Sequence, residues 1–497
     1  MNIRYVARVL GYFSWATAPL MLPSLAFAAY YREGRAVFGL LLSMIMCGVV
    51  GGVLVRIGRN APDRFYQREA LGLVGMAWLL VSGLGALPFL FSGVLSPIDA
   101  IFESASGFTT TGASVFGESH FRSVPNGILF WRSFTHWIGG MGIIVLFLAV
   151  LPYLGAGGKQ VFKSEAPGPD PRALKPRIRD TATVLYTIYL GFTVLETGAL
   201  MIAGLGFFEA LCHTFGTLAT GGFSTRPASV GEFRNVWVEI IVIVFIICAG
   251  TNFALYYGML RGDWKALFRD TEWRAYITIL LIVVLLVAIN LMGWGVQTPS
   301  QSARPVKLYD SFTEALRYAA FQVVSIMTTT GFCTDDFDRW PDFSRMMLLV
   351  LMFVGGCAGS TGGGMKVIRL LILAKMAYWR LEKSFRPRTV RTMRIGGYPV
   401  DEAVQQTVYA FFVLHLFWTV LGSLFMAYLG LPFMSALGAV AATLNNIGPG
   451  LEAVGASMNY GAVPYLGKVF LAVSMVLGRL ELFSVLVLFV PAFWKRE

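Results

Sequence analysis

Thr109-Thr110-Thr111-Gly112 is the stretch that decides the fold, because three related tetrapeptides follow it. They are Ala219-Thr220-Gly221-Gly222, Thr328-Thr329-Thr330-Gly331 and Asn445-Asn446-Ile447-Gly448. The final glycines lie 110, 109 and 117 residues apart, and an alanine stands 12 residues before each of them. Self-similarity at a regular spacing is the mark of an internal repeat. The sequence therefore predicts four related units.

Each repeated tetrapeptide ends in a residue that reaches backbone angles closed to the others. Glycine adopts positive φ readily, so a short run ending in it can turn successive carbonyl oxygens to one side. Four such runs around one axis would replace the water shell of a dehydrated cation, as filter loops do in cation channels. We expect a pseudo-fourfold ring that lines a cation pathway.

The composition places the chain in a lipid bilayer. Of its 497 residues, 56% are hydrophobic and only 14% are charged, and the mean hydropathy is +0.65. A soluble domain carries about 25% charged residues. The net charge of +12 does not indicate nucleic-acid binding, because the sequence has no basic helix interleaved with aromatic residues. The five cysteines form no CxxC pair, which argues against a disulfide framework or a metal cluster.

Apolar stretches predict ten membrane spans, each long enough to cross about 30 Å of hydrocarbon. Two of them, 9–30 and 36–55, form an N-terminal pair outside the repeat, and Pro19 and Pro23 should kink the first. The first spans of the four units are 70–91, 182–205, 275–292 and 404–428. The second spans are 128–154, 236–260, 346–373 and 469–494. Between them lie segments too short to cross, such as 97–107 and 433–443, which predict re-entrant pore helices.

The predicted fold class is therefore an all-α membrane protein of four span, pore helix and span repeats plus an N-terminal helix pair. The expected divisions are an N-terminal extension at 1–69 and repeats at 70–180, 181–274, 275–401 and 402–497. Because each pore helix would aim its partially negative C-terminal end at the loop, the arrangement favours a cation.

Lysine and arginine gather on one side of the predicted spans. That side holds Arg56, Arg59, Lys159, Lys163, Arg261, Lys265 and the run from Lys375 to Arg394. The opposite side has scattered cations beside acids, such as Arg122 near Glu118. Cytoplasmic loops carry the excess of basic residues, so both termini should be cytoplasmic. The dense run at 375–394 is also a candidate docking surface for an acidic partner or lipid.

A glycine-rich stretch interrupts the second span of the third unit. Residues 355–364 read GGCAGSTGGG, and each glycine costs about 1 kcal/mol relative to alanine in a helix. We expect this segment to unwind beside the pathway. A close helix-packing face is one alternative. A phosphate-binding loop is another, but Met365 separates Gly364 from Lys366.

Arg479 lies in the middle of the last predicted span, where arginine is costly and usually functional. We expect its side chain to project below the tetrapeptides, to donate to carbonyls of the 355–364 segment and to oppose the passage of cations. The alternative is a structural arginine paired with an acid on a neighbouring helix.

The order and spacing of these motifs resemble the TrkH subfamily of the Trk/Ktr/HKT potassium transporters over nearly the whole chain. The motifs are TTTGAS, LATGGFST, TTTGF, NNIGPG, GGCAGSTGGGMK and LGRLE. The resemblance implies channel-like K⁺ uptake across the bacterial inner membrane. It also implies a homodimer, contact with membrane lipid, and a cytosolic nucleotide-binding subunit of the TrkA type. No nucleotide motif is present in this chain, so any nucleotide would be held by that partner.

The same resemblance assigns roles to particular residues. The K⁺-binding oxygens would come from Thr110, Thr111, Thr220, Gly221, Thr329, Thr330, Asn446 and Ile447. The filter glycines would be Gly112, Gly222, Gly331 and Gly448. The gate would consist of Gly355, Gly356, Gly359, Ser360, Thr361, Gly362, Gly363, Gly364 and Arg479.

Several alternatives to a selective K⁺ channel stay open at this point. The fourth tetrapeptide has no threonine, which predicts only a modest preference for K⁺ over Na⁺. A less selective Na⁺/K⁺ channel and an H⁺- or Na⁺-coupled symporter are therefore alternatives. A voltage sensor is not indicated, because no span carries arginine at every third position. An enzyme is not expected either, because no catalytic constellation is recognisable.

Overall fold

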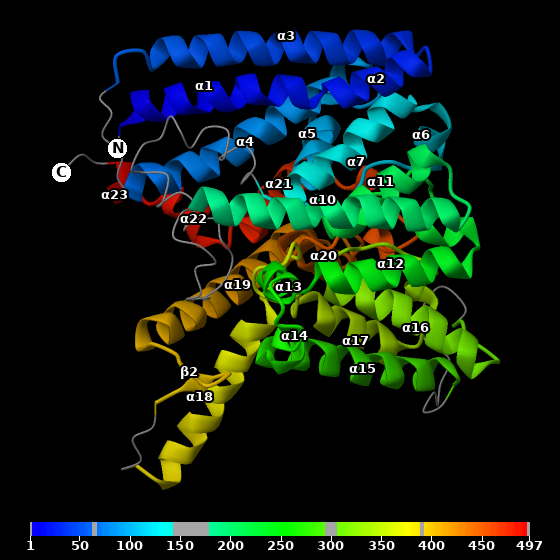
Figure 1. Cartoon of the computed structure of the whole chain (residues 1–497), viewed down its shortest axis with the longest axis vertical. Coiled ribbons are helices and arrows are strands. Elements are labelled where there is room, and N and C mark those ends of the chain that lie inside the picture. The colour runs from blue at the N-terminus through cyan, green and yellow to red at the C-terminus, as the bar shows by residue number, and fades with distance from the viewer. Residues whose placement is uncertain (1, 62–66, 143–177, 294–305, 388–391, 495–497) are drawn as a thin grey trace.

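The computed structural model describes residues 2–61, 67–142, 178–293, 306–387 and 392–494 (Figure 1). Its N-terminal part consists of α1 (Ile3–Leu20), α2 (Leu22–Tyr30) and α3 (Gly34–Ile57). Next come α4 (Gln67–Phe91), α5 (Pro97–Phe108), α6 (Glu118–Ser123) and α7 (Asn126–Gly140). After residue 177 follow α10 (Ile178–Ile202), α11 (Phe207–Leu218), η2 (Ser229–Phe233), α12 (Val236–Ala249), α13 (Phe253–Leu260) and α14 (Ala266–Arg269).

The second half of the chain repeats this order of long and short helices. It begins with α15 (Thr271–Leu291), α16 (Phe312–Met327), η3 (Phe337–Arg339), α17 (Asp342–Met352) and α18 (Val367–Phe385). A two-residue antiparallel ladder joins β1 (Arg394–Ile395) to β2 (Tyr398–Pro399). The last elements are α19 (Glu402–Tyr428), α20 (Phe433–Leu444), η4 (Glu452–Val454), η5 (Tyr460–Ala462), α21 (Tyr465–Arg479), α22 (Phe483–Leu486), η6 (Val487–Phe489) and α23 (Pro491–Trp494).

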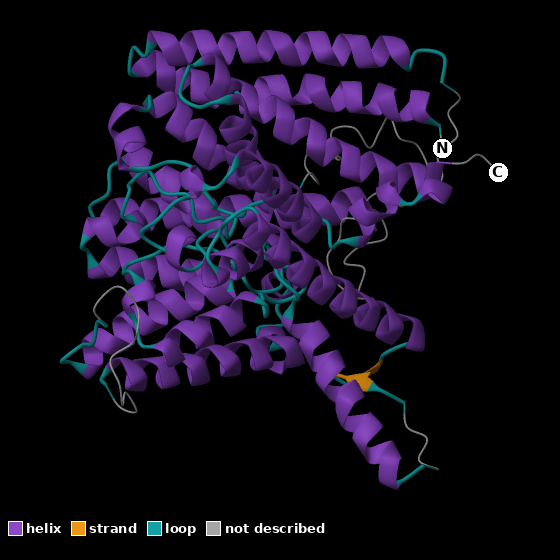
Figure 2. Cartoon of the chain, turned by 180° about the vertical axis from the view of Figure 1, so that it is seen from behind, coloured by secondary structure: helices purple, strands orange, loops and turns teal. Residues whose placement is uncertain are grey.

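The helices surround a centre made of loops. Figure 2 shows these loops gathered in the middle of the molecule, with long helices on either side. The antiparallel pair α1 and α3 lies at one edge, and α18 projects from the opposite end (Figures 1 and 2). The start of α1 and the short α23 lie at the same end of the molecule.

The predicted first spans are long helices, whereas the second spans are broken. Among the described residues, five helices are long and apolar enough to cross a membrane, or up to seven spans if each of two bent pairs counts as one. The bent pairs are α12 with α13, at 92°, and α21 with α22 and η6, at 119°. The expectation of ten spans is therefore not met by length and composition alone. Gly250 and the glycines of residues 355–364 interrupt the second spans of the second and third units. The predicted span 128–154 continues into residues outside the described part of the chain.

The four short helices that precede the tetrapeptides begin with recognisable signals. The Ser96 side chain caps α5 by accepting a hydrogen bond from the backbone N–H of Asp99, and Pro97 occupies the first turn. Both features favour a helix start. Pro432 is the N-cap residue of α20, and Gly206 is the N-cap residue of α11. These helices correspond to the predicted re-entrant segments.

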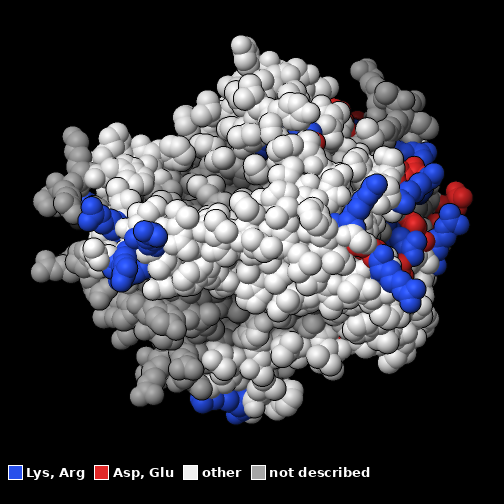
Figure 3. Space-filling model, turned by 90° about the horizontal axis from the view of Figure 1, so that it is seen from above, with Lys and Arg blue, Asp and Glu red and all other residues white. Residues whose placement is uncertain are grey.

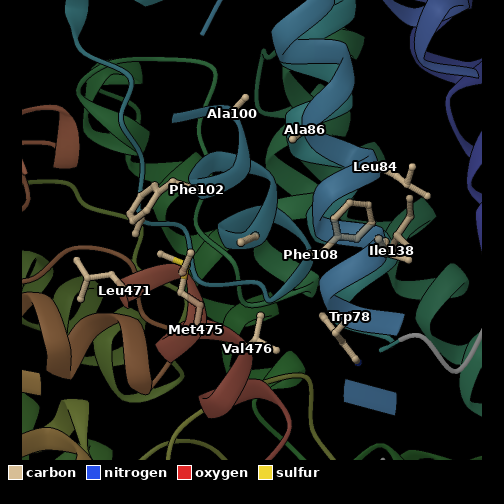
Figure 4. Close-up of a cluster of buried hydrophobic side chains, with 14 of the residues drawn as sticks. Trp78, Leu84, Ala86, Ala100, Phe102, Phe108, Ile138, Leu471, Met475 and Val476 are labelled. Carbon is tan, nitrogen blue, oxygen red and sulfur yellow. The ribbon is translucent and has the colours of Figure 1, made fainter. Parts of the chain in front are cut away.

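An apolar cluster fixes the first of these short helices in place. Figure 4 shows Phe102 of α5 near Met475 of α21, and Phe108 of α5 on the side of Trp78 of α4. All four side chains are almost completely buried. Burying a large apolar side chain stabilises a fold by roughly 1.5–3 kcal/mol. This packing holds the C-terminal end of α5 at the centre of the molecule.

Candidate functional site

Each of the four short helices ends in the same capped turn. At the end of α5, the N–H of Thr110 donates to the carbonyl oxygen of Gly107 (3.1 Å), and the N–H of Thr111 donates to that of Ser106 (2.9 Å). This pair of bonds is the Schellman motif of helix C-termini. The equivalent second bonds in the other loops are Gly221 to Gly216 (2.8 Å), Thr330 to Ser325 (2.8 Å) and Ile447 to Ala442 (2.8 Å). The four tetrapeptides therefore share one backbone structure.

The motif requires a left-handed residue, and here that residue is not glycine. Thr110, Thr220 and Thr329 have φ values of 54°, 52° and 63°, and Asn446 has a φ of 56°. Asparagine tolerates this region, but a β-branched residue rarely adopts it. Such strain costs roughly 1–3 kcal/mol per residue and clusters at functional sites. Three consecutive units accept this strain at the same position.

Eight carbonyl oxygens of these loops accept no hydrogen bond within the described chain. The amides of the tetrapeptides bond back to their own helices, as described above. Within the described chain, no hydrogen bond ends on the carbonyl oxygens of the eight residues predicted to bind K⁺. These residues are Thr110, Thr111, Thr220, Gly221, Thr329, Thr330, Asn446 and Ile447. Buried carbonyls are normally paired, so eight free ones in one place are available to a cation.

The four filter glycines close a ring of contacts. A Cβ atom at Gly112 would collide with the carbonyl oxygen of Gly221, one at Gly222 with that of Thr330, and one at Gly331 with that of Ile447. The fourth loop contacts the first and completes the ring, because a Cβ atom at Gly448 would lie 2.7 Å from the carbonyl oxygen of Thr111. All four glycines also have positive φ, between 77° and 99°. Only glycine meets both requirements.

The same glycines line one small cavity. Gly112, Gly222, Gly331 and Gly448 contribute to a cavity of about 90 Å³ at the mouth of the ring. Arg132 and Arg226 also line it. The loops, distant in sequence, thus share one opening.

Within the described chain, two side-chain oxygens of the ring are buried without a hydrogen-bond partner. They are Thr110 Oγ1 and Asn446 Oδ1, and both residues are at most 1% exposed. The other end of the Asn446 amide donates to Thr111 Oγ1 and to the carbonyl oxygen of Met475, each at 2.9 Å. An orphaned buried oxygen calls for a missing partner. A set composed only of carbonyl, hydroxyl and amide oxygens suits an alkali cation.

Charged residues outside the tetrapeptides brace the loops, and the sequence analysis did not assign them. Glu103 of α5 accepts from Arg132 (2.6 Å) and from the backbone N–H of Val115 (2.9 Å). Arg132 also donates to the carbonyl oxygen of Ser224 (2.8 Å), which ties the first loop to the second. Glu103, an acid inside a re-entrant helix, was the only sequence signal of this brace.

The third and fourth loops are joined on the same side of the ring. Asp338 accepts from the backbone N–H of Glu452 at 3.0 Å. Burial raises the pKa of Asp338 above its ordinary value. The Tyr460 hydroxyl donates to the carbonyl oxygen of Gly448 (2.8 Å). These bonds hold the loop that follows Gly448 against its neighbours.

The glycine-rich segment of the third unit is irregular, as expected. It connects α17 to α18, and Gly355, Gly359 and Gly364 have positive φ of 81°, 73° and 70°. Gly356 packs against the carbonyl oxygen of Gly250, and the Ser360 hydroxyl donates to the carbonyl oxygen of Cys357 (2.6 Å). The segment thus fills the space between the break at Gly250 and the tetrapeptides.

The segment touches the ring through Gly362 and Gly363. The N–H of Gly363 donates to Thr329 Oγ1 at 2.6 Å. A Cβ atom at Gly362 would lie 3.0 Å from the carbonyl oxygen of Thr328. The predicted gate residues are therefore in direct contact with the predicted filter.

Arg479 makes the bond proposed for it, and it also donates to another helix among the described residues. Its Nη1 donates to the carbonyl oxygen of Thr361 (2.7 Å), within the glycine-rich segment. Its Nη2 donates to the carbonyl oxygens of Gly139 (2.7 Å) and Gly140 (3.0 Å), where α7 ends. One guanidinium therefore joins the second helices of the first, third and fourth units at the level of their breaks.

Three further charged residues near Arg479 were not assigned from the sequence. Lys366 is buried and donates to the carbonyl oxygen of Gly362. Glu481 forms an ion pair with Arg369 of α18. Glu272 at the start of α15 accepts from the backbone N–H groups of Ala358 (2.8 Å) and Ile368 (2.9 Å). Charges thus anchor both ends of the glycine-rich segment.

These features define a class: a multi-pass membrane protein whose four central loops bring carbonyl oxygens that accept no hydrogen bond in the described chain to one place. The comparisons agree with that class, because residues 41–496 match the TrkH family model, described as "Cation transport protein". The Trk system potassium uptake protein TrkH of Salmonella typhimurium is 38% identical, with both chains fully covered. TrkG of Escherichia coli is 33% identical over 99% of each chain. The chain belongs to the TrkH family, whose members are transporters and not enzymes.

A solved structure has the same fold. The crystal structure of the potassium transporter TrkH from Vibrio parahaemolyticus superposes with a TM-score of 0.86 at 36% identity, and each chain is covered completely. The predicted all-α membrane fold is confirmed by this similarity.

Proposed function

We propose that this chain takes up K⁺ through a filter formed by the four tetrapeptides. The ion would be held by the carbonyl oxygens of Thr110, Thr111, Thr220, Gly221, Thr329, Thr330, Asn446 and Ile447. The observation that carries the proposal is that these eight oxygens accept no hydrogen bond in the described chain, while the amides beside them are used. Free carbonyls fixed by capped helix ends replace the water shell of the ion without reorganisation. The names of the relatives, which are potassium uptake proteins, support K⁺ as the ion.

The proposed gate consists of the 355–364 segment and Arg479. In the arrangement described above, the segment lies against the filter, and a guanidinium lies beside it. A half-buried positive charge below a cation filter opposes cation entry, because it is screened less than it would be in bulk water. Opening would require Arg479 to release the carbonyl oxygens of Thr361, Gly139 and Gly140.

The proposed setting is the bacterial inner membrane, with the basic ends of the helices and both termini in the cytoplasm. The proposed divisions remain an extension at 1–69 and units at 70–180, 181–274, 275–401 and 402–497. Helix α18 projects from the rest of the molecule (Figure 2). It exposes Tyr378, Leu381 and Phe385 together with basic residues. Such an exposed apolar and basic surface suits a protein partner. We assign it to a second copy of the chain and to a cytosolic subunit of the TrkA type.

Isotope flux into proteoliposomes tests this function. The purified chain should admit ⁸⁶Rb⁺, and K⁺ should compete better than Na⁺ by a modest factor. Gly222→Ala should reduce the flux at least tenfold, because the added methyl group collides with the carbonyl oxygen of Thr330. Gly198→Ala is the matched control, since a Cβ atom there meets nothing within 4 Å.

The same assay separates the alternatives. If uptake requires an imposed proton or Na⁺ gradient, the protein is a coupled symporter and not a channel. Equal competition by Na⁺ and K⁺ would indicate a less selective channel. A Gly222→Ala variant that folds and conducts like the control would overturn the filter assignment.

A further inference from the structure

The N-terminal helix pair, which the proposed function does not use, ends in a basic recess. The recess measures about 860 Å³ and lies where α1 begins and α3 ends. Arg4, Arg56 and Arg59 line it, together with Asn60 and the indole of Trp15. Among the residues that the structure describes, no acidic side chain lines it.

Close packing of the two helices fixes the geometry of this recess. A Cβ atom at Gly58 would lie 2.6 Å from the carbonyl oxygen of Arg4, and one at Gly11 would lie 2.8 Å from that of Gly51. The Ser14 hydroxyl donates to the carbonyl oxygen of Cys47 (2.7 Å), and the Trp15 indole donates to that of Gly48 (3.0 Å). Glycine contacts and side-chain hydrogen bonds of this kind join helices firmly in a membrane. The basic side chains are therefore presented by a rigid frame.

The three arginines have no partner within the described part of the chain. None of Arg4, Arg56 and Arg59 takes part in an ion pair or side-chain hydrogen bond there, and all three are exposed. Figure 3 shows basic atoms without acidic ones at the left end of this face, whereas the right end mixes both charges. A general excess of positive charge accounts for arginines at this end of the helices. It does not account for three of them around one recess.

An apolar surface leads away from the recess along the outer side of α3. Exposed apolar side chains recur there at helical spacing, and they are Phe38, Leu41, Ile45, Val49, Val53 and Ile57. In the most apolar stretch of α3, only 28% of the residues are buried inside the protein. Such a helix face lies against hydrocarbon in a bilayer. The stripe begins beside Arg56 and Arg59 and runs the length of the helix.

We propose that the recess binds the headgroup of one anionic phospholipid, whose acyl chains lie along the α3 stripe. Guanidinium groups bind phosphate oxygens through paired hydrogen bonds. Basic pockets between membrane helices recognise anionic headgroups, and an indole at the interface is typical of such sites. The charge and the adjoining apolar stripe together select a lipid over a free anion. This site stands apart from the proposed ion pathway and does not rest on the proposed function.

Native mass spectrometry of the full-length chain in detergent tests this site, with phosphatidylglycerol, phosphatidylcholine and inorganic phosphate as probes. The unaltered chain should retain one phosphatidylglycerol more than the triple variant Arg4→Gln, Arg56→Gln, Arg59→Gln. The affinity for that lipid should fall by at least about tenfold in the triple variant. Arg32→Gln with Arg35→Gln is the matched control, because these arginines lie at the opposite end of the same helix pair.

The results that overturn the proposal are equally definite. Equal retention of phosphatidylglycerol by the control and the triple variant would remove the site. The proposal would also be wrong if the unaltered chain bound phosphatidylcholine as tightly as phosphatidylglycerol. It would be wrong too if inorganic phosphate, at the same concentration as the lipid, displaced phosphatidylglycerol. Because the three arginines are exposed, the variants should fold, and Arg59→Gln alone provides a milder test with the same expected direction.

Discussion

Thr329 and Thr110 occupy the same left-handed position in two loops, yet their side chains have different surroundings. Thr329 Oγ1 accepts the N–H of Gly363 from the glycine-rich segment, whereas Thr110 Oγ1 has no partner. The first hydroxyl therefore links filter and segment, and the second belongs to the filter alone. Because of this difference, Thr110 can serve as a control for substitutions of Thr329.

Thr329→Ala should increase basal cation flux. The change leaves the buried N–H of Gly363 without an acceptor, which costs roughly 1–3 kcal/mol and weakens the closed position of the segment. We expect a rise of about fivefold or more in ⁸⁶Rb⁺ flux. Thr110→Ala is the control for a change in the filter itself, and Thr329→Ser should restore the closed state. If Thr110→Ala raised the ⁸⁶Rb⁺ flux by the same factor, the increase could not be attributed to the loss of the Gly363 hydrogen bond.

Arg479→Ala should also raise basal flux, and by more. The variant loses both the charge and three hydrogen bonds to the carbonyl oxygens of Thr361, Gly139 and Gly140. Hydrogen bonds to charged groups contribute about 1.5–3 kcal/mol each, so at least a tenfold rise is expected. Arg479→Lys keeps the charge without the forked geometry and should lie between the two. If the single-channel or isotope flux is unchanged in both variants, Arg479 is not part of the gate.

At the scale of whole elements, the start of α15 anchors the glycine-rich segment. Glu272→Ala should destabilise the protein, because Glu272 Oε1 accepts from both Ala358 and Ile368. The buried N–H of Ala358 would lose its acceptor, at roughly 1–3 kcal/mol, and the half-buried N–H of Ile368 would lose its acceptor as well. Thermal unfolding in detergent should show a Tm several degrees lower, whereas Glu314→Ala, an exposed acid in the first turn of α16, should not. Equal Tm values for the two variants would show that this anchor contributes nothing.

The elements differ in how far the sequence alone revealed them. The long first helices and the short helices before each tetrapeptide were predictable, because their apolar length and their caps are local properties. The break at residues 353–366 was also predictable from six glycines in ten residues. The breaks after Ala249 and Arg479 were visible only as isolated glycines, Gly250 and Gly478, which helices tolerate in other contexts.

The contacts between units could not be predicted from the sequence. That Gly112 meets Gly221, or that Arg132 reaches Ser224, depends on the order in which the four loops are arranged in space. The pairing of Glu481 with Arg369 likewise joins residues that are 112 positions apart. Local sequence patterns do not show which residues far apart in the chain come into contact. The end of the predicted span 128–154 and the basic residues Lys159 and Lys163 lie outside the described residues.

At the scale of the whole molecule, the two ends of the helices differ in charge. Figure 3 shows basic atoms alone at one end and mixed charges at the other. We expect Arg380→Cys in α18 to react with a membrane-impermeant maleimide only after the cells are permeabilised, and Arg122→Cys to react in intact spheroplasts. The native cysteines give little background, since four of the five are buried. The reverse pattern of labelling would invert the proposed orientation.

The central claim is that one cation site lies within the ring of the four tetrapeptides. Anomalous diffraction from crystals grown with Rb⁺ or Tl⁺ tests it most directly. The account predicts an anomalous peak inside the ring, bounded by the carbonyl oxygens of Thr111, Gly221, Thr330 and Ile447. A well-ordered ring without such a peak, in crystals that bind the ion elsewhere on the protein, would contradict it.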